Sequence, residues 1–512
     1  MIPLTVHEIL VATAGRLAGA GQAEDLVVDG PVVTDSRLCR PGGLYVARAG
    51  EHSNGHDFVA AAREAGAVLA LVEREVADPL PQVVVQDTAT AFGLLARGVV
   101  EAAGPALTVV AVTGSSGKTS TKDLLAHVLA ALGPTVAAQE SFNSEIGVPL
   151  TVCRTMPDTR YLVVEMGARG LGHLQYLATI APPDIAVELN VGYAHASEFG
   201  SLEAVQQAKS ELVQALSSSG TAVLNLDDPL VAGMRAQVAT GAQVLGFSTA
   251  DDPAAAVLAR DVRLDEQGRA GFELVSRLPG AAGTADVSLR LHGEHHVSNA
   301  LAAAAVALRL GLGLDRVAQM LSSAHPVSRW RMEVSRRPDG VTVVNDAYNA
   351  NPDSVRAALK ALVSMRGSGR TWAVLGEMLE LGTESVRLHD EIGRLAVRLD
   401  VSRVLAVGQG ARAIHTGAVM EGSWGEESAW VADVDAAYEL LRSQLVAGDV
   451  VLFKSSRDSG LRWLGERVAQ DPRGTPPTQG AVVAPEPGRP ENLDAVTAPR
   501  HGSTGDPQAP AR

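Results

Sequence analysis

An apolar stretch, Leu107–Val112 (LTVVAV), runs directly into the loop Thr113-Gly114-Ser115-Ser116-Gly117-Lys118-Thr119-Ser120, and a helical pattern follows. A buried strand, a glycine-rich loop and a helix in this order are the context that a phosphate-binding loop requires. The glycines let the backbone wrap phosphate oxygens, and the amides at the helix N-terminus supply partial positive charge. The Lys118 ammonium can reach the β- and γ-phosphates, and the Thr119 hydroxyl can bind Mg²⁺. The stretch therefore predicts a nucleotide-binding α/β unit, although Val112 stands where the full pattern has glycine.

Apolar segments alternate with helical patterns further along the chain, which predicts a mostly parallel sheet covered on both faces. A helix is expected at Glu203–Ser218, and residues 257–291 alternate polar and apolar around a turn at Asp265–Gly268, which predicts a small antiparallel insert. The other segments expected to be buried strands of this unit are Tyr161–Glu165, Ile185–Leu189 and Thr221–Leu226.

The length of 512 residues favours several domains, and we expect an α/β protein with three of them. Residues 1–104 form a small N-terminal α/β domain, residues 105–325 a central phosphate-loop domain, and residues 326–470 a Rossmann-like, doubly wound C-terminal domain. Residues 471–512 carry nine of the 26 prolines and are expected to be a disordered tail. The strands expected in the outer domains are Pro31–Ser36, Gly43–Val46, Val68–Val72, Val341–Asn345, Thr371–Leu375, Val404–Val407 and Val450–Phe453, with a helix at Phe58–Ala65.

The composition excludes several classes of function. A formal net charge of −15 argues against nucleic acid as a partner. No run of about 18 apolar residues occurs, so no membrane-spanning helix is expected. The N-terminus has a helix-capping box at Thr5–Glu8 instead of a signal peptide, and Cys39 and Cys153 are expected to be reduced thiols. Together these features predict a cytoplasmic protein, which we expect to be a monomer.

Three residues outside the loop are candidates for chemistry. Glu165 ends a buried strand, where a carboxylate could bind Mg²⁺ or could be solvated. His195 follows another strand and could lie at the same edge or on the surface. Lys209 falls on the apolar stripe of its helix between Val205 and Leu212, where a lysine either extends its amine to solvent or is desolvated and reactive.

These segments resemble, in order, the central domain of the Mur ligase family: Thr113–Ser120, Glu165, Asn190–His195 and Lys209–Glu211. That family uses ATP to join amino acids or a dipeptide to UDP-N-acetylmuramic acid, and the resemblance extends over about residues 30–465. It implies two Mg²⁺ ions, one held by Thr119 and Glu165 and the other by His195 and a carbamylated Lys209. A carbamate would turn the lysine cation into a carboxylate-like ligand.

Other segments resemble the family's substrate-binding motifs. Thr34–Arg37 and Asn54–Phe58 look like segments that bind the UDP-peptide. Ser141–Gly147 resembles a further motif of the family, from which Ser141 and Ser144 depart. In the segment Gly293–Asn299 the resemblance implies that Asn299 faces adenine. The substrate contacts that it implies are Ser36, Arg37, Asn143, Tyr348, Asn349, Asn351, Lys454 and Arg457.

The C-terminal motifs distinguish between members of the family that add different amino acids or a dipeptide. Asn345–Pro352 is similar to the members that add D-alanyl-D-alanine to UDP-N-acetylmuramoyl-tripeptide, and the motifs of the diaminopimelate-adding members are absent. Gly376–Gly382 and Lys454–Arg457 also fit, with Ser455 in place of the usual glycine. The resemblance implies ATP contacts at Thr113–Ser120, Asn299, Arg331 and Asp346, and catalytic roles for Lys118, His195, Lys209 and Arg331.

By this resemblance the reaction is amide formation through an acyl-phosphate, with ATP, UDP-N-acetylmuramoyl-tripeptide and D-alanyl-D-alanine as substrates. Two alternatives stay open. One is the neighbouring ligase that adds lysine or diaminopimelate, and the other is a nucleotide-binding scaffold that changes shape without ligation. Glu165, His195 and Lys209 together favour catalysis, because a scaffold has no use for a second metal site.

Overall fold

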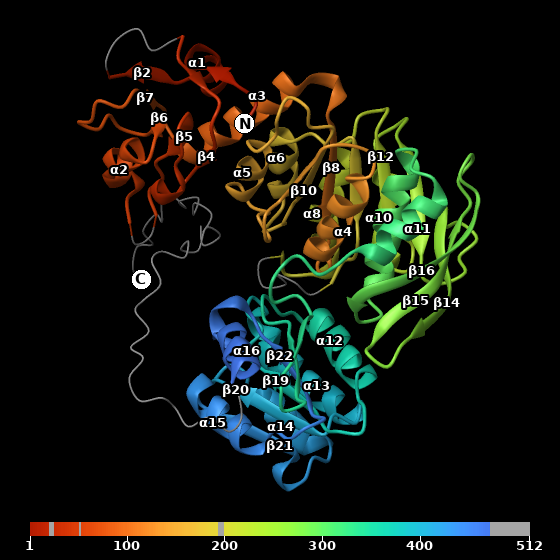
Figure 1. Ribbon diagram of the computed structural model, residues 1–512. Helices are drawn as coiled ribbons and strands as arrows, with labels where there is room; N and C mark the ends of the chain where they lie inside the picture. Colours follow the sequence, from red (N-terminus) through yellow and green to blue (C-terminus); the bar gives the residue numbers. More distant parts are fainter. Residues whose placement is uncertain (20–24, 51–52, 193–198, 472–512) are drawn as a thin grey trace, which may run out of the picture.

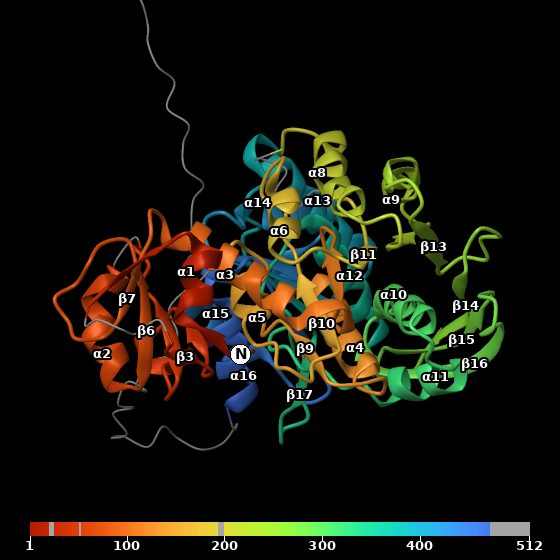
Figure 2. The ribbon, with the colours of Figure 1, turned by 90° about the horizontal axis from the view of Figure 1, so that it is seen from above.

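The computed structural model describes residues 1–19, 25–50, 53–192 and 199–471. Three lobes follow the order of the chain, with the N-terminal and central lobes side by side and the C-terminal lobe against the central one (Figure 1). Seen from above, the N-terminal lobe, the central lobe and the strands β14–β16 follow one another across the molecule (Figure 2). No helix in the described ranges is long and apolar enough to cross a membrane.

The N-terminal lobe holds a five-stranded sheet in the order β2-β7-β6-β5-β4, in which only the β2–β7 pair is antiparallel. The capping box is present, since the Thr5 side chain accepts from Glu8 N and the Glu8 carboxylate accepts from Thr5 N. The strand expected at Pro31–Ser36 forms only over Val32–Val33, because the Asp35 side chain caps a 3₁₀ turn that starts at Ser36. The elements are β1 (Leu4–Thr5), α1 (Val6–Thr13), β2 (Arg16–Ala18), β3 (Val27–Val28), β4 (Val32–Val33), β5 (Gly43–Val46), α2 (Val59–Glu64), β6 (Ala67–Val72), β7 (Gln82–Val84) and α3 (Thr88–Ala103).

The central lobe is built on a nine-stranded sheet in the order β16-β15-β14-β13-β12-β11-β8-β10-β9. Strand β8, which leads into the phosphate loop, lies between β10 and β11 and is parallel to both. The strands are β8 (Thr108–Thr113), β9 (Thr135–Ala137), β10 (Tyr161–Glu165), β11 (Ile185–Glu188), β12 (Thr221–Asn225), β13 (Gln243–Ser248), β14 (Val257–Leu264), β15 (Arg269–Ser276) and β16 (Gly283–His292). The helices are α4 (Lys118–Leu129), α5 (Gly147–Val152), α6 (His173–Ile180), α8 (Leu202–Gln214), α9 (Pro229–Gly233), α10 (His296–Arg309) and α11 (Leu314–Ser323).

The antiparallel insert expected at 257–291 is present as β14, β15 and β16. The turn is where the sequence places it, since Gly268 N donates to Asp265 O. The insert continues the central sheet, because β14 pairs in parallel with β13. It lies against α10 and α11, which cover one face of this end of the sheet (Figure 1).

The C-terminal lobe has a six-stranded sheet in the order β17-β18-β22-β19-β20-β21. Helices α12, α13 and α14 pack on one face, and α15 and α16 on the other, as in a doubly wound sheet. The sequence did not reveal edge strand β17, which is antiparallel to β18, because its residues are mostly polar and partly exposed. The elements are β17 (Glu333–Arg336), β18 (Thr342–Asn345), α12 (Pro352–Ser364), β19 (Thr371–Leu375), α13 (Ser385–Arg398), β20 (Arg403–Val407), α14 (Arg412–Glu421), β21 (Ser428–Val431), α15 (Val434–Gln444), β22 (Val450–Lys454) and α16 (Leu461–Gln470).

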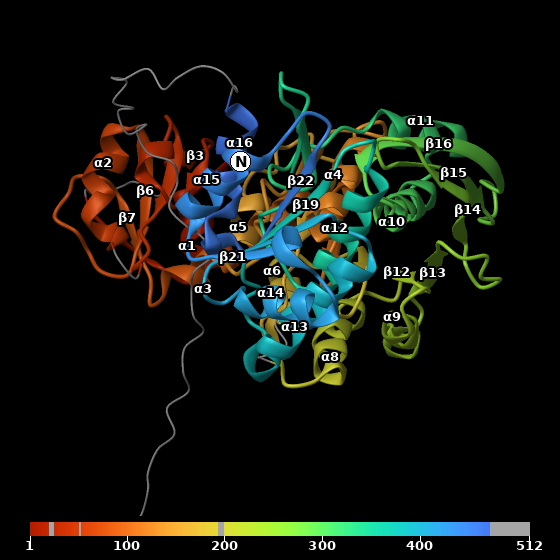
Figure 3. The same cartoon turned by 90° about the horizontal axis from the view of Figure 1, so that it is seen from below.

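The N-terminal and central lobes share a hydrophobic core, whereas the C-terminal lobe has its own. One continuous apolar cluster runs through the N-terminal and central lobes, and Phe92 and Leu95 of α3 pack in it with residues of β10 and α6. The C-terminal lobe has clusters of its own on the two faces of its sheet. From below, α13 and α14 of this lobe lie in front of the central lobe (Figure 3). The first two lobes are therefore packed as one unit, while the third meets them across a polar pocket.

Candidate active site

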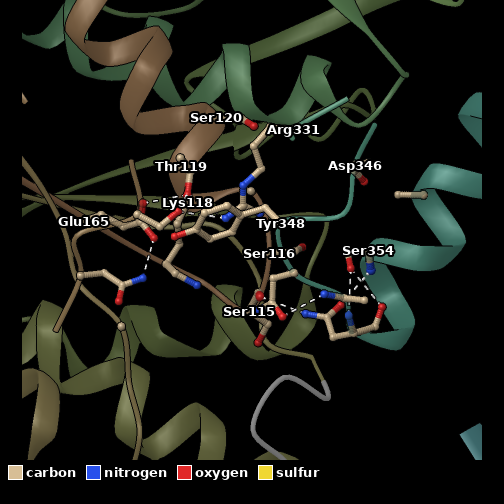
Figure 4. A pocket seen from close by; sticks show the side chains of 18 of the residues that line it. Ser115, Ser116, Lys118, Thr119, Ser120, Glu165, Arg331, Asp346, Tyr348 and Ser354 are labelled. Atoms are coloured by element: carbon tan, nitrogen blue, oxygen red, sulfur yellow. Dashed lines mark hydrogen bonds between the residues drawn. The ribbon is translucent and has the colours of Figure 1, made fainter. Parts of the chain in front are cut away.

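A cavity of about 730 Å³ lies between the central and C-terminal lobes, lined by the phosphate loop on one side and by loops after β18, β19 and β22 on the other. Figure 4 shows side chains from both lobes pointing into it. Many residues that the sequence singles out line this cavity. They are Ser115, Ser116, Gly117, Lys118, Thr119, Ser120, Asn143, Glu165, Asn299, Arg331, Asp346, Tyr348, Asn349, Asn351, Lys454 and Arg457.

The phosphate loop has the backbone that its glycines predict. Gly114 and Gly117 have φ values of +152° and +81°, which favour glycine. A Cβ on Gly117 would lie 2.6 Å from Asn299 Oδ1, so a side chain there would collide with α10. Gly117 precedes α4 with no side-chain cap, which leaves the first amides of that helix to a ligand. The Lys118 ammonium donates to Gly114 O at 2.7 Å and so folds back over the loop.

Glu165 and Thr119 are held together at the end of β10. The Thr119 hydroxyl donates to Glu165 Oε2 at 2.9 Å, and the Asn143 amide donates to Glu165 Oε1 at 2.8 Å. The Ser141 hydroxyl lies 2.7 Å from that of Thr119. This arrangement gathers hydroxyl and carboxylate oxygens, the donors that Mg²⁺ prefers, beside the loop.

Arg331 reaches from the junction of the lobes into the pocket (Figure 4). Its Nη2 donates to Thr119 Oγ1 at 3.2 Å and to Ser141 Oγ at 3.0 Å, and its guanidinium lies 4.4 Å from the centroid of the Tyr348 ring. Trp330 and Met332 on either side have φ values of +56° and +50°, an unfavourable conformation for bulky residues. The strained backbone directs the cation between them toward the phosphate loop, and strain of this kind clusters at functional sites.

The opposite wall of the pocket is tied together by ion pairing and hydrogen bonds. Lys454 Nζ lies 2.8 Å from Asp346 Oδ2 and donates to Asn349 O at 2.7 Å. Burial lowers the pKa of Lys454, and the adjacent Asp346 opposes that shift. Asn351 caps α12, and its amide donates to Ser115 O at 3.1 Å, so this residue links the C-terminal lobe directly to the phosphate loop.

Two further charged side chains lie buried behind the loop. Lys209 is 5% exposed, and burial together with the field of Lys118 lowers its pKa from 10.5 to about 7, against the effect of Glu188. Glu188, at the end of β11, is fully buried, and neither of its carboxylate oxygens has a hydrogen-bond partner among the described residues. Burial raises the pKa of Glu188, and the field of Lys209 opposes this.

Sequence reasoning missed Glu188 although the signal was present. It ends a buried strand as Glu165 does, on the other side of β8. It also missed His295 and His296, two imidazoles that line the cavity with ring centroids 4.3 Å apart. Burial lowers the pKa of His295 to about 4, so this side chain is neutral at pH 7.

Some expected site residues lie elsewhere. Thr113 and Gly114, at the start of the loop, are buried and do not line the cavity. Ser36 and Arg37 belong to a 3₁₀ turn of the N-terminal lobe, where Arg37 pairs with Asp35, and they do not line the cavity. Lys209 is not among the lining residues either, and His195 lies outside the described residues. Their roles stay predictions.

Three family models match the chain in sequence order. The model described as "Mur ligase family, catalytic domain" matches residues 31–99. "Mur ligase middle domain" matches residues 112–307, and "Mur ligase, glutamate ligase domain" matches residues 330–457. The cavity therefore lies between the segments that match the last two models.

Individual proteins match over nearly the whole chain. A protein of Mycobacterium leprae named UDP-N-acetylmuramoyl-tripeptide–D-alanyl-D-alanine ligase is 46% identical, covering 92% of this chain and 99% of the relative. A crystal structure of MurF from Acinetobacter baumannii is similar with a TM-score of 0.80 at 31% identity, covering 92% of this chain and 99% of that one. MurF from Thermotoga maritima in complex with ADP has a TM-score of 0.73 at 29% identity, covering 86% and 97%.

Proposed function

The chain belongs to the Mur ligase family, and we propose that it uses ATP to join D-alanyl-D-alanine to UDP-N-acetylmuramoyl-tripeptide in the synthesis of a peptidoglycan precursor. The relative that is 46% identical bears the name of this activity. The observation that carries the proposal is the pocket, in which the phosphate loop faces Tyr348, Asn349 and Asn351 of the C-terminal lobe. The enzyme would act in the cytoplasm, as a monomer, on two soluble substrates and a nucleotide.

The phosphate loop would bind the triphosphate of ATP. The uncapped N-terminus of α4 and the backbone amides of the loop supply the partial positive charge that phosphates need. Lys118 and Arg331 come from opposite lobes to the same region, since Arg331 contacts Thr119, the residue after Lys118. Asn299 lies against Gly117 at the start of α10, where it could contact the adenine. A related protein with ADP bound has a similar fold.

In the first step the terminal carboxylate of the tripeptide would attack the γ-phosphorus of ATP. A carboxylate–phosphorus bond forms, the bond to the β-phosphate oxygen breaks, and ADP leaves. Negative charge grows on the transferred oxygens and on the leaving group. Lys118 and Arg331 would stabilise this charge, and their position in the lining of the pocket supports these roles.

The side chains near the loop fit a Mg²⁺ ion. Thr119 and Glu165 place hydroxyl and carboxylate oxygens together, and the two Glu188 oxygens are buried without a partner among the described residues. The described residues contain no group of three or more His, Cys, Asp or Glu side chains suited to a metal, so phosphate oxygens and water would complete each site. We assign one ion to Thr119 and Glu165 and a second to Lys209 and His195. Mg²⁺ would neutralise phosphate charge during transfer.

Lys209 would be carbamylated. A lysine whose pKa is about 7 is an uncharged amine in about half of the molecules at pH 7, and only the uncharged amine reacts with CO₂. The nitrogen lone pair bonds to the carbon of CO₂, one proton leaves the nitrogen, and a carboxylate-like anion results. The burial of Lys209 supports this assignment, because an uncompensated buried ammonium is strongly destabilising, whereas a carbamate would be paired with the cation that it binds.

In the second step the amine of D-alanyl-D-alanine would attack the acyl-phosphate and release phosphate. The amine would enter from the C-terminal lobe, whose Tyr348, Asn349 and Lys454 line the pocket. The contacts of Arg331 and Asn351 with the central lobe support closure of the two lobes over the substrates. Closure would exclude water, which otherwise hydrolyses the acyl-phosphate.

The test is the mass of the product formed from UDP-N-acetylmuramoyl-tripeptide, ATP and one candidate amine at a time. We expect product with D-alanyl-D-alanine and none with lysine or diaminopimelate, with phosphate release that requires both the tripeptide and the amine. Ligation of a single diamino acid would identify the neighbouring ligase. Phosphate release without any ligated product would favour a nucleotide-binding scaffold.

A further inference from the structure

Arg331 enters the pocket from a turn whose backbone is strained on both sides of it. Trp330 and Met332 have φ values of +56° and +50°, which side chains of this size adopt only when their surroundings impose it. The hydrogen bonds of Arg331 to Thr119 and Ser141 are made by the end of its side chain. They do not account for the backbone on either side, so other contacts must hold the turn.

Three hydrogen bonds within the C-terminal lobe fix the backbone of this turn. Trp330 N donates to Glu333 Oε2 at 3.0 Å, and Trp330 O accepts from Tyr348 N at 3.3 Å. Met332 N donates to Asp346 Oδ1 at 3.1 Å. These bonds hold the path of the chain, while the position of the large Trp330 side chain depends on its own contacts.

Helix α16 encloses the Trp330 indole, of which only 9% is exposed. The indole Nε1 donates to Glu466 Oε1 at 2.8 Å. The rings of Trp330 and Trp463 form a T-shaped pair with centroids 5.2 Å apart, and the guanidinium carbon of Arg462 lies 5.1 Å from the Trp330 centroid. The acceptor on Glu466 fixes the indole in this place, because a buried N–H without an acceptor is costly.

One carboxylate oxygen of Glu466 binds two consecutive residues. Its Oε1 accepts from the Trp330 indole and from Arg329 Nη2. Arg329 also lies over the Trp330 ring, with its guanidinium carbon 4.8 Å from the centroid. Glu466 therefore contacts both residues that precede Arg331, although neither Glu466 nor Trp330 lines the pocket.

Tyr348 connects the indole to Arg331. The rings of Trp330 and Tyr348 are stacked with centroids 6.4 Å apart, and the Arg331 guanidinium lies 4.4 Å from the Tyr348 centroid. Figure 4 shows Tyr348 and Arg331 together in the pocket. Because Tyr348 N also donates to Trp330 O, a movement of the indole would displace both the ring beside the guanidinium and the backbone that carries it.

We propose that Glu466 is a positioning residue for Arg331, because it fixes the Trp330 indole and so holds the guanidinium against the phosphate loop. The proposal rests on the ligase function above, in which Arg331 stabilises the transferred phosphoryl group. A guanidinium that binds phosphate must be accurately directed, since its N–H groups form a rigid fork. Without Glu466 the strained turn would relax, and Arg331 would withdraw from Thr119.

The experiment compares the binding of ADP and of β,γ-methylene-ATP, a non-hydrolysable analogue, measured by calorimetry with Mg²⁺. Only the analogue carries the γ-phosphate group on which Arg331 would act. Glu466→Ala should weaken binding of the analogue by about 10-fold, the contribution of one hydrogen bond to a charged group, and leave binding of ADP unchanged. Glu466→Gln should restore most of the affinity, because its amide oxygen can still accept from the Trp330 indole.

A double-mutant cycle assigns the effect to Arg331. Arg331→Ala should weaken binding of the analogue, and Glu466→Ala should have no further effect in that background. Trp330→Phe keeps a ring and removes its N–H, so it should also weaken the analogue alone, and the test does not depend on whether Glu466→Ala folds. Native affinity in Arg331→Ala, additive losses, equal losses for ADP and the analogue, or no loss would each overturn the proposal.

Asp435→Ala is the matched control. It removes an exposed carboxylate of α15 that pairs with Arg467 of α16 at 2.9 Å, and it should bind both nucleotides like the native enzyme. Because the measurement needs neither tripeptide nor amine, it is independent of the test of the ligase function. A selective loss of the analogue in an enzyme that never ligates D-alanyl-D-alanine would overturn the function and support the role of Glu466. Normal ligation without a selective loss would do the reverse.

Discussion

Two carboxylates end the strands on either side of β8, and their surroundings differ completely. Glu165 of β10 lies opposite Val112 and accepts hydrogen bonds from Thr119 and Asn143 at the wall of the pocket. Glu188 of β11 lies opposite Thr113, and neither of its oxygens has a partner among the described residues. The same sequence feature, a glutamate at the end of a buried parallel strand, therefore produces an open site and a closed one.

The reason is the face of the sheet to which each side chain points. Residues two apart on a strand share a face. Glu165 shares its face with Val163, which packs with Leu124 and Leu125 of α4. Glu188 shares its face with Ala186, which packs in the cluster that includes α8, the helix of Lys209. A carboxylate on the α4 face meets the phosphate loop, and one on the α8 face meets a buried lysine.

The largest expected effect is the loss of activity when the Lys118 side chain is removed from the open site. Lys118→Ala should lower the rate of turnover by ~10³-fold or more, because a charge that stabilises the transferred phosphoryl group is lost. Steady-state phosphate release measures the rate, and circular dichroism checks the fold. Lys360→Ala, on the exposed side of α12, is the control and should be fully active. A nearly normal rate in Lys118→Ala would contradict the assignment of ATP to this loop.

The next prediction tests whether Lys209, which lies in the closed site with Glu188, also takes part in catalysis. Lys209→Ala should lose most of the activity, roughly 10²-fold or more if a ligand of the second ion is removed. Acetate or another short-chain acid should restore part of the rate by supplying a carboxylate to the vacated position. Removing bicarbonate should slow the native enzyme. A Lys209→Ala variant that turns over well, together with an unmodified amine in a crystal grown near neutral pH, would exclude the carbamate.

The two glutamates should respond in opposite ways when their charge is removed. In metal-free protein, Glu188→Gln should raise the free energy of unfolding by about 1–3 kcal/mol, since a buried carboxylate without a partner is costly. Glu165→Gln should lower it by about 1–3 kcal/mol, because the new amide group faces the donors of Thr119 and Asn143. Urea unfolding in the presence of a chelator measures both. Destabilisation by both substitutions would mean that Glu188 is paired in solution.

The last prediction concerns the pH dependence of stability. The folded-state pKa of Lys209 is lowered to about 7 from 10.5, so between these values the unfolded chain binds one more proton. Stability should therefore increase as pH rises from 7 to 10.5. Glu188 has a raised pKa in the folded state, so its contribution to stability should decrease as pH rises above the ordinary range of a glutamate.

The check for this pH dependence is the free energy of unfolding of metal-free protein measured across pH. Lys209→Met should reduce the increase in the free energy of unfolding between pH 7 and 10.5. Glu188→Gln should reduce the decrease in that free energy that begins at lower pH. An unchanged profile in Lys209→Met would show that Lys209 is not buried as a neutral amine.

Much of the fold could be predicted from local sequence patterns. The strands Gly43–Val46, Tyr161–Glu165 and Thr371–Leu375 have the expected bounds, because each is a short apolar run between turn-forming residues. The antiparallel strands β14–β16 were also expected from alternating polarity. Edge strand β17 was not, because an exposed strand carries no apolar run and is stabilised by pairing with β18.

The sequence by itself determined the conformation of the phosphate loop. Its glycines, Lys118 and Thr119 are close together in the chain, and the loop requires only a strand before it and a helix after it. The sequence also determined the motifs that identify the family. Only the tertiary structure decided which residues meet. Arg331 and Asn351 reach the loop from the C-terminal lobe, while Glu188 and Lys209 are buried behind it, on the side of the sheet that α8 covers. These placements depend on side-chain direction and on packing between residues far apart in sequence, which no local pattern records.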